Sequence, residues 1–272
     1  MLKGKKIAVI GGGKMGSIIA QALLEKRLCL KKSVIVTDVD SNRLGFLAST
    51  MGIPVSSDNK QATKNADIII VAVKPQNMKE TLQDISPVVN ESKIIISIAA
   101  GITTSFIESF LLKGTRVLRV MPNTPAMVGE GATAVAKGAY ATTGDLTMTR
   151  AIFDALGLSF EVEEKYMDAV TGLSGSGPAY FFMIIEALID AGEKVGLARD
   201  LAAKLSAQTM LGAARLCLQS DKSPSELREM VTSPSGTTAA GLKVLREGKL
   251  RETLLAAVEA ATKRSKDLAA GK

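Results

Sequence analysis

Histidine and tryptophan are both absent from this chain of 272 residues. The lack of histidine excludes Ser-His-Asp and Cys-His catalysis, most zinc sites and the most common general acid. Because aromatic residues make up only 4% of the chain, the core must be built from aliphatic side chains. Any chemistry must therefore come from a bound cofactor, or from a substrate that needs little acid–base assistance.

Cysteine, concentrated charge and long hydrophobic runs are also scarce. Cys29 and Cys217 are isolated from each other, so we expect neither a disulfide nor a metal site. The net charge of +7 is spread along the chain, without the basic, aromatic-rich patch of a nucleic-acid-binding protein. No window reaches the roughly 18–20 apolar residues of a membrane span, and the first apolar run leads directly into glycines. We expect a cytoplasmic protein with no nucleic-acid or membrane partner.

The first half of the chain alternates short apolar runs with helical patterns. Continuous apolar runs are typical of strands that are buried on both faces of a sheet. Helical spacing between them predicts an α/β fold with a parallel, doubly wound sheet. The predicted strands cover residues 5–10, 33–38, 66–73, 92–100 and 115–121, with two further strands at 133–138 and 158–163, and the predicted helices cover 14–26, 41–52 and 76–89.

After about residue 163 the pattern changes to long helices rich in Ala and Leu. They are predicted over residues 177–197, 199–220 and 250–271. Several are apolar around most of their circumference, which favours burial in a homo-oligomer over a compact monomeric bundle. We therefore expect residues 1–163 to form the sheet domain and residues 164–272 to form an all-α dimerisation and substrate domain.

A glycine motif follows the first predicted strand and opens the next helix. In "GGGKMG", Gly11 permits a tight turn, Gly13 lets the backbone approach a pyrophosphate, and Gly16 lets helix and strand pack closely. The helix N-terminus adds free N–H groups. A glycine turn without a ligand is the weaker interpretation, because the strand, the helix and a downstream acid all fit. We predict a Rossmann-type domain that binds NADPH or NADH through Gly11, Gly12, Gly13, Lys14, Met15 and Gly16.

The choice of nucleotide depends on two side chains after the second strand. Asp38 is placed to accept hydrogen bonds from a ribose 2′-hydroxyl, which favours NADH. Arg43 follows closely and suits the 2′-phosphate of NADPH, so the preference stays open. Asp38 has a second interpretation, as the N-cap of the helix that begins near Asp40.

Two more strands end in residues that we expect near the cofactor, because the carboxyl ends of strands line the crevice of an open α/β sheet. Three roles fit Lys74: a proton donor, a phosphate contact, or a solvated lysine without a ligand. Of these we favour a role beside the cofactor. Asn123 either faces the nicotinamide or belongs to a rigid strand exit fixed by the prolines on both sides of it. The first of these strand ends comprises Ala72, Val73, Lys74 and Pro75.

The segment "MVTSPSGTTAAGL", residues 230–242, is uncharged and rich in hydroxyl side chains and glycine. Before it, Ser223, Pro224 and Glu226 fit a helix capping box. Small hydroxyls beside the free amides of a second helix N-terminus suit a small carboxylate ligand. The simpler alternative is a capped helix–helix turn, although the hydroxyls exceed what two caps need.

The segments "AVKPQ", "RVMPNTPA", "LSGSGPAY" and "MVTSPSGTTAAGL" together resemble the motifs of the pyrroline-5-carboxylate reductase family. The resemblance covers essentially the whole chain. It implies hydride transfer from NADPH or NADH to the C=N carbon of 1-pyrroline-5-carboxylate, giving L-proline in the last step of proline biosynthesis. An imine that arrives protonated needs no strong enzyme acid, in keeping with the missing histidine. The resemblance also implies a homodimer of intertwined helical domains and, in many members, rings of dimers.

The resemblance further implies roles for individual residues. Thr238 is expected to contact the ring nitrogen, Asn59 to lie at the cofactor, and Asp221 to lie near the substrate amine. Ser235 departs from the family pattern, which has glycine at that position, and this puts the conformation of the loop in question. The remaining implied substrate contacts are Ser176, Gly177, Pro178, Ser233, Pro234, Ser235, Gly236 and Thr237.

Two other functions fit parts of the sequence. The β-hydroxyacid dehydrogenases resemble this chain in architecture, but the positions of their catalytic lysine and asparagine hold Phe181 and Ile185. Alcohol oxidation would therefore lack its acid–base group. A non-catalytic dinucleotide-binding module is the alternative from a different class, and it would bind the cofactor without turnover of any small imine or keto acid.

Overall fold

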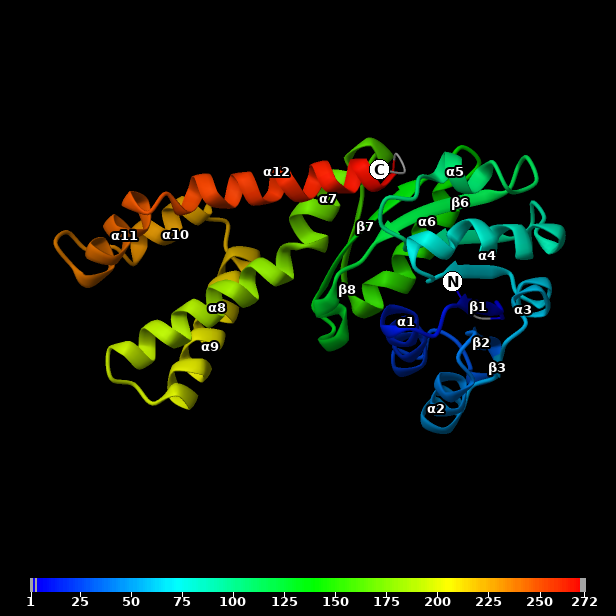
Figure 1. Cartoon of the computed structure of the whole chain (residues 1–272), viewed down its shortest axis with the longest axis horizontal. Helices are drawn as coiled ribbons and strands as arrows, with labels where there is room; N and C mark the ends of the chain where they lie inside the picture. Colours follow the sequence, from blue (N-terminus) through cyan, green and yellow to red (C-terminus); the bar gives the residue numbers. More distant parts are fainter. Residues whose placement is uncertain (1, 3, 270–272) are drawn as a thin grey trace. The chain divides into compact units, whose positions relative to one another are not determined.

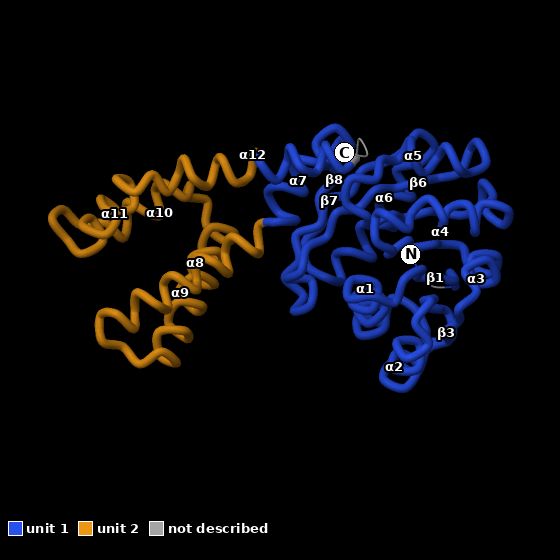
Figure 2. Tube along the Cα trace, in the orientation of Figure 1, with its two compact units in different colours: residues 1–176, 260–272 blue, residues 177–259 orange. Residues whose placement is uncertain are grey.

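The computed structural model describes residue 2 and residues 4–269, which fall into two compact units (Figure 2). Unit 1 contains the chain up to Ser176 together with the residues from Ala260 onward, and unit 2 contains residues 177–259. This division differs from a boundary near residue 163, because Met167 is fully buried against Ala134 and Ala136 and so belongs to unit 1. The functional domains 1–163 and 164–272 stay a prediction.

One eight-stranded sheet, with the order β3-β2-β1-β4-β5-β6-β7-β8, forms the centre of unit 1 (Figure 1). Every neighbouring pair of strands is parallel except β6 and β7, so the predicted doubly wound α/β sheet is confirmed. The two-residue strand β3 was not predicted, because it is too short to show a periodic pattern. The strands are β1 (Ile7–Ile10), β2 (Val34–Thr37), β3 (Val55–Ser56), β4 (Ile68–Val71), β5 (Ile94–Ser97), β6 (Arg116–Met121), β7 (Gly131–Lys137) and β8 (Gly157–Glu161).

The helices of unit 1 connect these strands. The helices predicted at 14–26, 41–52 and 76–89 correspond to α1, α2 and α4, whereas α3, α5, α6 and α7 were not predicted. Asp40 is the N-cap of α2, since its carboxylate accepts from the N–H groups of Asn42 and Arg43. The interpretation of Asp38 as that N-cap is therefore wrong. The helices are α1 (Lys14–Glu25), α2 (Ser41–Met51), α3 (Asn59–Asn65), α4 (Met78–Ile85), α5 (Thr104–Glu108), α6 (Thr143–Phe153) and α7 (Met167–Val170).

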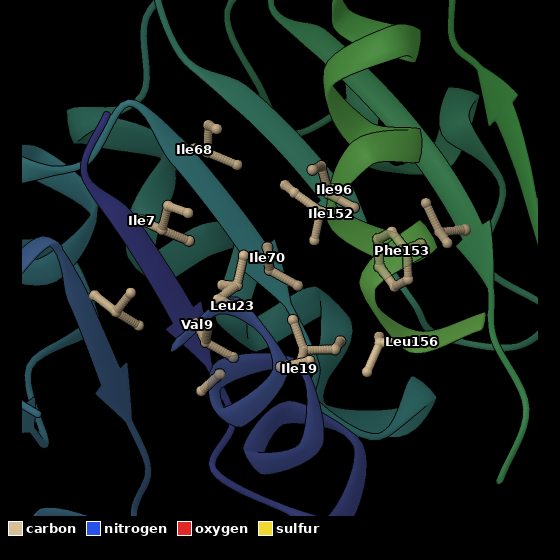
Figure 3. Close-up of a cluster of buried hydrophobic side chains, with 14 of the residues drawn as sticks. Ile7, Val9, Ile19, Leu23, Ile68, Ile70, Ile96, Ile152, Phe153 and Leu156 are labelled. Atoms are coloured by element: carbon tan, nitrogen blue, oxygen red, sulfur yellow. The ribbon is translucent and has the colours of Figure 1, made fainter. Parts of the chain in front are cut away.

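Aliphatic side chains on both faces of the sheet make the core of unit 1. On one face, Ile7 and Val9 of β1 pack with Ile70 of β4 and with side chains of α1 and α6 (Figure 3). On the other face, Ala8 and Ile69 belong to a second cluster with side chains of α4. Because alternate residues of each strand enter different clusters, the strands are apolar at every position, as the continuous runs in the sequence indicate.

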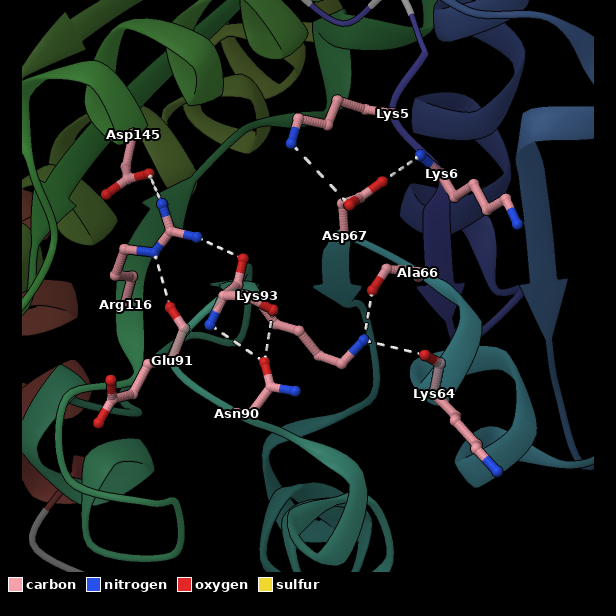
Figure 4. Close-up of polar contacts among 11 residues, drawn as sticks. Lys5, Lys6, Lys64, Ala66, Asp67, Asn90, Glu91, Lys93, Arg116 and Asp145 are labelled. Atoms are coloured by element: carbon pink, nitrogen blue, oxygen red, sulfur yellow. Dashed lines mark hydrogen bonds and ion pairs between the residues drawn. The ribbon is translucent and has the colours of Figure 1, made fainter.

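Charged groups occupy the amino ends of the strands (Figure 4). Lys93, just before β5, is 6% exposed, and its ammonium donates to the carbonyls of Lys64 (3.0 Å) and Ala66 (2.6 Å) at the end of α3. Burial lowers the pKa of Lys93, and nearby Asp67 opposes that shift. Arg116 at the start of β6 pairs with Asp145 at 2.8 Å. These contacts fix the ends of α3 and α6 against the sheet.

Unit 2 consists of helices with little core of their own. The buried positions among residues 177–259, all of which the structure describes, are Gly177, Pro178, Ala202 and Leu227. Large apolar side chains such as Phe182 (62% exposed) lie on the surface of this unit. The helices are α8 (Gly177–Lys194), α9 (Arg199–Gln219), α10 (Pro224–Met230), α11 (Thr237–Glu247) and α12 (Leu250–Ala269), the last of which extends into unit 1.

Two further features of the helical segments bear on the predictions. The capping box predicted for α10 is confirmed, with Ser223 as N-cap, Pro224 in the first turn and Glu226 bonded back to Ser223. Hydrogen bonds from Ser223 lower the pKa of Glu226.

By length and composition alone, the helical run Glu164–Lys194 would be able to cross a membrane, and 17% of its most apolar window is buried within the chain.

Replacing Lys93 with methionine should destabilise the protein. The substitution keeps the length of the side chain but leaves the carbonyls of Lys64 and Ala66, the second of which is buried, without their donor. We expect a loss of about 1–3 kcal/mol in the free energy of unfolding, measured by urea denaturation at a fixed protein concentration. Lys113→Met, at an exposed loop position, is the control and should change stability by less than about 0.5 kcal/mol. Equal stability of the two variants would contradict the capping role of Lys93.

Candidate active site

The turn between β1 and α1 lies against the end of β4. Gly11 has a φ of +101°, a conformation that glycine adopts without strain, and its N–H donates to the Thr37 carbonyl at 2.8 Å. A Cβ at Gly11 would lie 2.8 Å from the carbonyl oxygen of Ala72, and a Cβ at Gly16 would lie 2.0 Å from that of Gly11. Gly13, the N-cap of α1, has open space beside its Cα. The turn thus offers a bare backbone surface at a helix N-terminus.

Asp38 and Arg43 both contact this glycine turn. The carboxylate of Asp38 accepts from the N–H of Gly12 (2.8 Å) and from the N–H of Asp40 (3.0 Å). The Arg43 guanidinium donates to the Gly12 carbonyl at 3.4 Å. The structure therefore brings an acid and a cation to the same turn, the two side chains on which the choice of nucleotide was predicted to depend.

The other predicted cofactor residues lie at the carboxyl ends of neighbouring strands. Ala72 follows β4, and its N–H donates to the carbonyl of Ile10 at 2.7 Å. Strands β1 and β4 are adjacent at the point where the strand order reverses, which is where open α/β sheets bind ligands. Beyond Ala72, Val73 is half-buried, and Lys74 and Pro75 are exposed, with Pro75 opening a short 3₁₀ turn.

Asn59 is held in place by a residue that the sequence did not indicate. The hydroxyl of Thr37, fully buried at the end of β2, donates to Asn59 Oδ1 at 2.6 Å. Asn59 is the first residue of α3, after its N-cap Asp58. A threonine at the end of an apolar strand is ordinary in a sequence, so its role becomes visible only when α3 is placed beside it.

Asn123 is bonded at both ends of its side-chain amide. It is 8% exposed, its Nδ2 donates to the Ser174 carbonyl (3.0 Å), and its Oδ1 accepts from the N–H of Ala132 (2.9 Å). These contacts tie the exit of β6 to the start of β7 and to the π-helical turn Thr171–Gly175. The geometry favours the interpretation of Asn123 as part of a rigid strand exit.

Arg119, which was not among the predicted site residues, lies buried beside this exit. It is 3% exposed and pairs with Glu164 (3.6 Å) and Asp168 (3.5 Å). Asp168 also accepts from the hydroxyl of Ser265 on α12 at 2.8 Å. One buried guanidinium therefore holds both the segment that leaves unit 1 and, through Asp168, the segment that returns. The signal in the sequence is the pair of arginines inside the apolar run "RVLRVM".

The predicted substrate loop of unit 2 is a tight turn followed by a helix N-terminus. The N–H of Gly236 donates to the Ser233 carbonyl at 3.1 Å, which closes a four-residue turn. Pro234 fixes a negative φ at the second position, and Ser235 has a φ of +61° at the third. This combination is a type II turn, whose third position favours glycine. The usual glycine of the family is thereby explained, and Ser235 adopts the same turn at a cost of about 1–2 kcal/mol.

The start of α11 leaves backbone donors available. Its N-cap is Gly236, which has no side chain to accept from the first N–H groups of the helix. Thr237 and Thr238 are the first two helical residues, and Thr238 is half-buried. A Cβ at Gly236 would lie 2.3 Å from Ser233 Oγ, so the turn also requires glycine there. The result is a charge-free group of N–H and O–H donors, suited to a carboxylate.

The remaining predicted substrate residues lie at other places in the chain. Ser176 is the last residue of unit 1 before the division, and Gly177 and Pro178 are buried in the first turn of α8. Asp221 is exposed in the connection between α9 and α10. Among the described residues, no group of three or more Asp, Glu or Cys side chains is arranged to hold a metal ion.

Known protein families match both halves of the chain. Residues 164–268 match the family model for pyrroline-5-carboxylate reductase dimerisation, and residues 6–101 match that for NADP oxidoreductase, coenzyme F420-dependent. The chain is 44% identical to a pyrroline-5-carboxylate reductase of Methanosarcina acetivorans, over 98% of this chain and 99% of the relative. It is 42% identical to one of Arabidopsis thaliana, over 97% and 95%.

Solved structures give the same result. The pyrroline-5-carboxylate reductase of Coxiella burnetii has a TM-score of 0.91 and 38% identity, over 97% of this chain and 98% of that one. The pyrroline carboxylate reductase of Plasmodium falciparum, solved with NADP bound, has a TM-score of 0.89 and 33% identity, over 98% of both chains.

Replacing Gly16 with alanine should weaken dinucleotide binding. The new methyl group would collide with the Gly11 carbonyl and displace the turn that presents the N–H groups of α1. We expect the dissociation constant for NADPH to rise at least about tenfold, equivalent to about 1.4 kcal/mol, in a titration that follows nicotinamide fluorescence. Gly45→Ala on α2, where a Cβ meets open space, is the matched control and should bind normally. Unchanged affinity in the Gly16 variant would argue against this turn as the cofactor site.

Proposed function

The chain belongs to the pyrroline-5-carboxylate reductase family, and from that premise we propose which of its residues carry out the reaction. The protein transfers hydride from NADPH or NADH to the C=N bond of 1-pyrroline-5-carboxylate, which gives L-proline in the last step of proline biosynthesis. The observation that carries this function is 44% identity to a curated reductase over 98% of the chain. That full-length match supports neither the hydroxyacid dehydrogenase nor the non-catalytic module.

The cofactor is proposed to bind on unit 1. The bare backbone around Gly13 and the N-terminus of α1 fit a pyrophosphate, since a side chain there would fill the space that it needs. Asp38 and Arg43 are at the ribose end, where Arg43 meets a 2′-phosphate. The bound reduced nicotinamide supplies the hydride. The proposed contacts are Gly11, Gly12, Gly13, Lys14, Met15, Gly16, Asp38, Arg43, Asn59, Ala72, Val73, Lys74 and Pro75, with Asn123 holding the strand exit.

The substrate is proposed to bind through the turn before α11. Its carboxylate accepts hydrogen bonds from the free N–H groups of α11 and from the hydroxyls of Ser233 and Thr237. Thr238 is the proposed catalytic contact, with its hydroxyl oxygen accepting from the protonated ring nitrogen. The iminium is already electron-poor, so these residues orient the ring and exclude water, and no histidine is needed. The remaining proposed contacts are Ser176, Gly177, Pro178, Asp221, Pro234, Ser235 and Gly236.

The protein is a homodimer whose helical segment belongs to the reductase dimerisation family. The exposed apolar side chains of α8 and α9 support this assembly, because they lack a core within their own chain. We further propose that dimers associate into a ring and that the protein is cytoplasmic, without a membrane or nucleic-acid partner. In this proposal the apolar run Glu164–Lys194 is covered by protein rather than by lipid.

Arg43→Ala should reduce the preference for NADPH over NADH. Removing the guanidinium takes away the positive charge beside the glycine turn, and only NADPH carries the phosphate that uses it. We expect the KM for NADPH to rise about tenfold and the KM for NADH to stay within about twofold of wild type. Both are measured from the oxidation of reduced nicotinamide with 1-pyrroline-5-carboxylate. A parallel loss with both nucleotides would contradict the assignment, and no turnover by the dimeric wild-type protein would overturn the proposed function.

Thr238→Ala should impair turnover while leaving cofactor binding intact. The variant loses one hydrogen bond to a charged nitrogen, worth about 1.5–3 kcal/mol, so kcat/KM for the imine should fall about 10- to 100-fold. Thr253→Ala, which removes an exposed hydroxyl that donates to the Lys249 carbonyl just before α12, is the matched control. Wild-type kinetics in the Thr238 variant would rule out the proposed role.

A further inference from the structure

Strand β8 has one face that is buried and one that is open. Ser159 is 4% exposed and points toward α6, whereas Leu158 and Phe160, which point the other way, are 54% and 52% exposed. Two large apolar side chains are therefore adjacent on an uncovered face of the outermost strand. Such a pair is costly to leave in water and indicates a surface that another protein element covers.

The free edge of β8 is already closed by side chains of its own chain. The N–H of Ser159 donates to Asp154 Oδ1 at 2.9 Å, and the Arg150 guanidinium donates to the Ser159 carbonyl at 3.0 Å. Both backbone groups at the middle of the edge are thus occupied, which prevents addition of another strand there. Whatever covers β8 must lie on its open face and not along its edge.

This open face runs directly into the dimerisation segment. Phe160 pairs with Ala134 of β7, so their side chains share a face, and Ala134 packs against Met167. Tyr166, the neighbour of Met167, is itself 51% exposed. Tyr166 and Met167 both lie inside residues 164–268, which match the dimerisation model. The exposed apolar face of β8 therefore leads onto the start of the segment that matches the dimerisation family.

The charged groups at the end of β8 lie on the face opposite the apolar pair. Glu161 alternates with Phe160 along β8 and therefore lies on the other face, where it forms an ion pair with Lys137 of β7 at 3.7 Å. A hollow of about 730 Å³ adjoins them, lined by Lys137, Glu161, Val162, Glu163, Glu164 and Tyr166.

We propose that Leu158 and Phe160 are part of the homodimer interface and that a second copy of this chain covers the open face of β8. The interface then extends beyond the helical segment onto the sheet of unit 1. This inference goes beyond the reductase activity and does not depend on it, because it concerns only which residues of one copy meet the other.

The absence of tryptophan provides a direct test. Phe160→Trp introduces a single indole, whose fluorescence reports its exposure in the intact protein. At a concentration where sedimentation shows dimers, we expect the indole at position 160 to be quenched by acrylamide several-fold less than the indole in the control variant Phe46→Trp. Phe46 is 65% exposed on α2, at the opposite edge of the sheet. Equal quenching in the two variants would overturn the proposal.

Photo-crosslinking identifies what shields the residue. With p-benzoylphenylalanine incorporated at position 160, irradiation of the dimer should give a covalent product of twice the chain mass of 28.5 kDa. The same amino acid at position 46 should give little of it. Crosslinking confined to one chain would show that the chain covers its own β8, and would overturn the proposal even if the indole were shielded.

Discussion

Unit 1 depends on one steric constraint. The turn between β1 and α1 has no room for side chains where it meets the end of β4. A single methyl group at Gly16 would lie 2.0 Å from the Gly11 carbonyl, closer than packed atoms can approach. With that space empty, α1 begins at Lys14, directly after the glycine turn that follows β1, and its first N–H groups have no partner within the helix. Asp38 and Arg43 then contact the same turn from the segments after β2 and in α2, and the nucleotide position that we propose follows from this glycine pattern.

Unit 2, in contrast, is a set of helices that does not bury its apolar side chains within one chain. Only four of its residues, all within the described range 177–259, are buried. At about 25 cal/mol per Å² of apolar surface, the exposed Phe, Leu and Met side chains represent a large unused contribution to stability. Association with a second copy supplies that burial, so folding of this unit and dimerisation are linked. The proposed substrate loop lies in this unit, and the geometry of that proposed site would therefore depend on the dimer.

The loop before α11 combines a strained backbone conformation with N–H groups that are available to a ligand. Ser235 adopts a left-handed conformation that favours glycine, and Gly236 leaves the first amides of α11 uncapped. Strained backbone and unsatisfied donors both cost stability when no ligand is present. A carboxylate that accepts from those amides offsets the cost, which is a physical reason for such an arrangement to occur at a binding site.

Local features of this protein were determined by the sequence alone. The aliphatic strands, the glycine fingerprint and the capping box of α10 depend on residues within a few positions of each other, and all three are present in the structure. Tertiary structure decided the rest. The bonds of Asn123 to Ser174, of Thr37 to Asn59 and of Arg119 to Asp168 join residues from different elements. No local pattern encodes such pairs, because each exists only after the sheet has brought distant segments together.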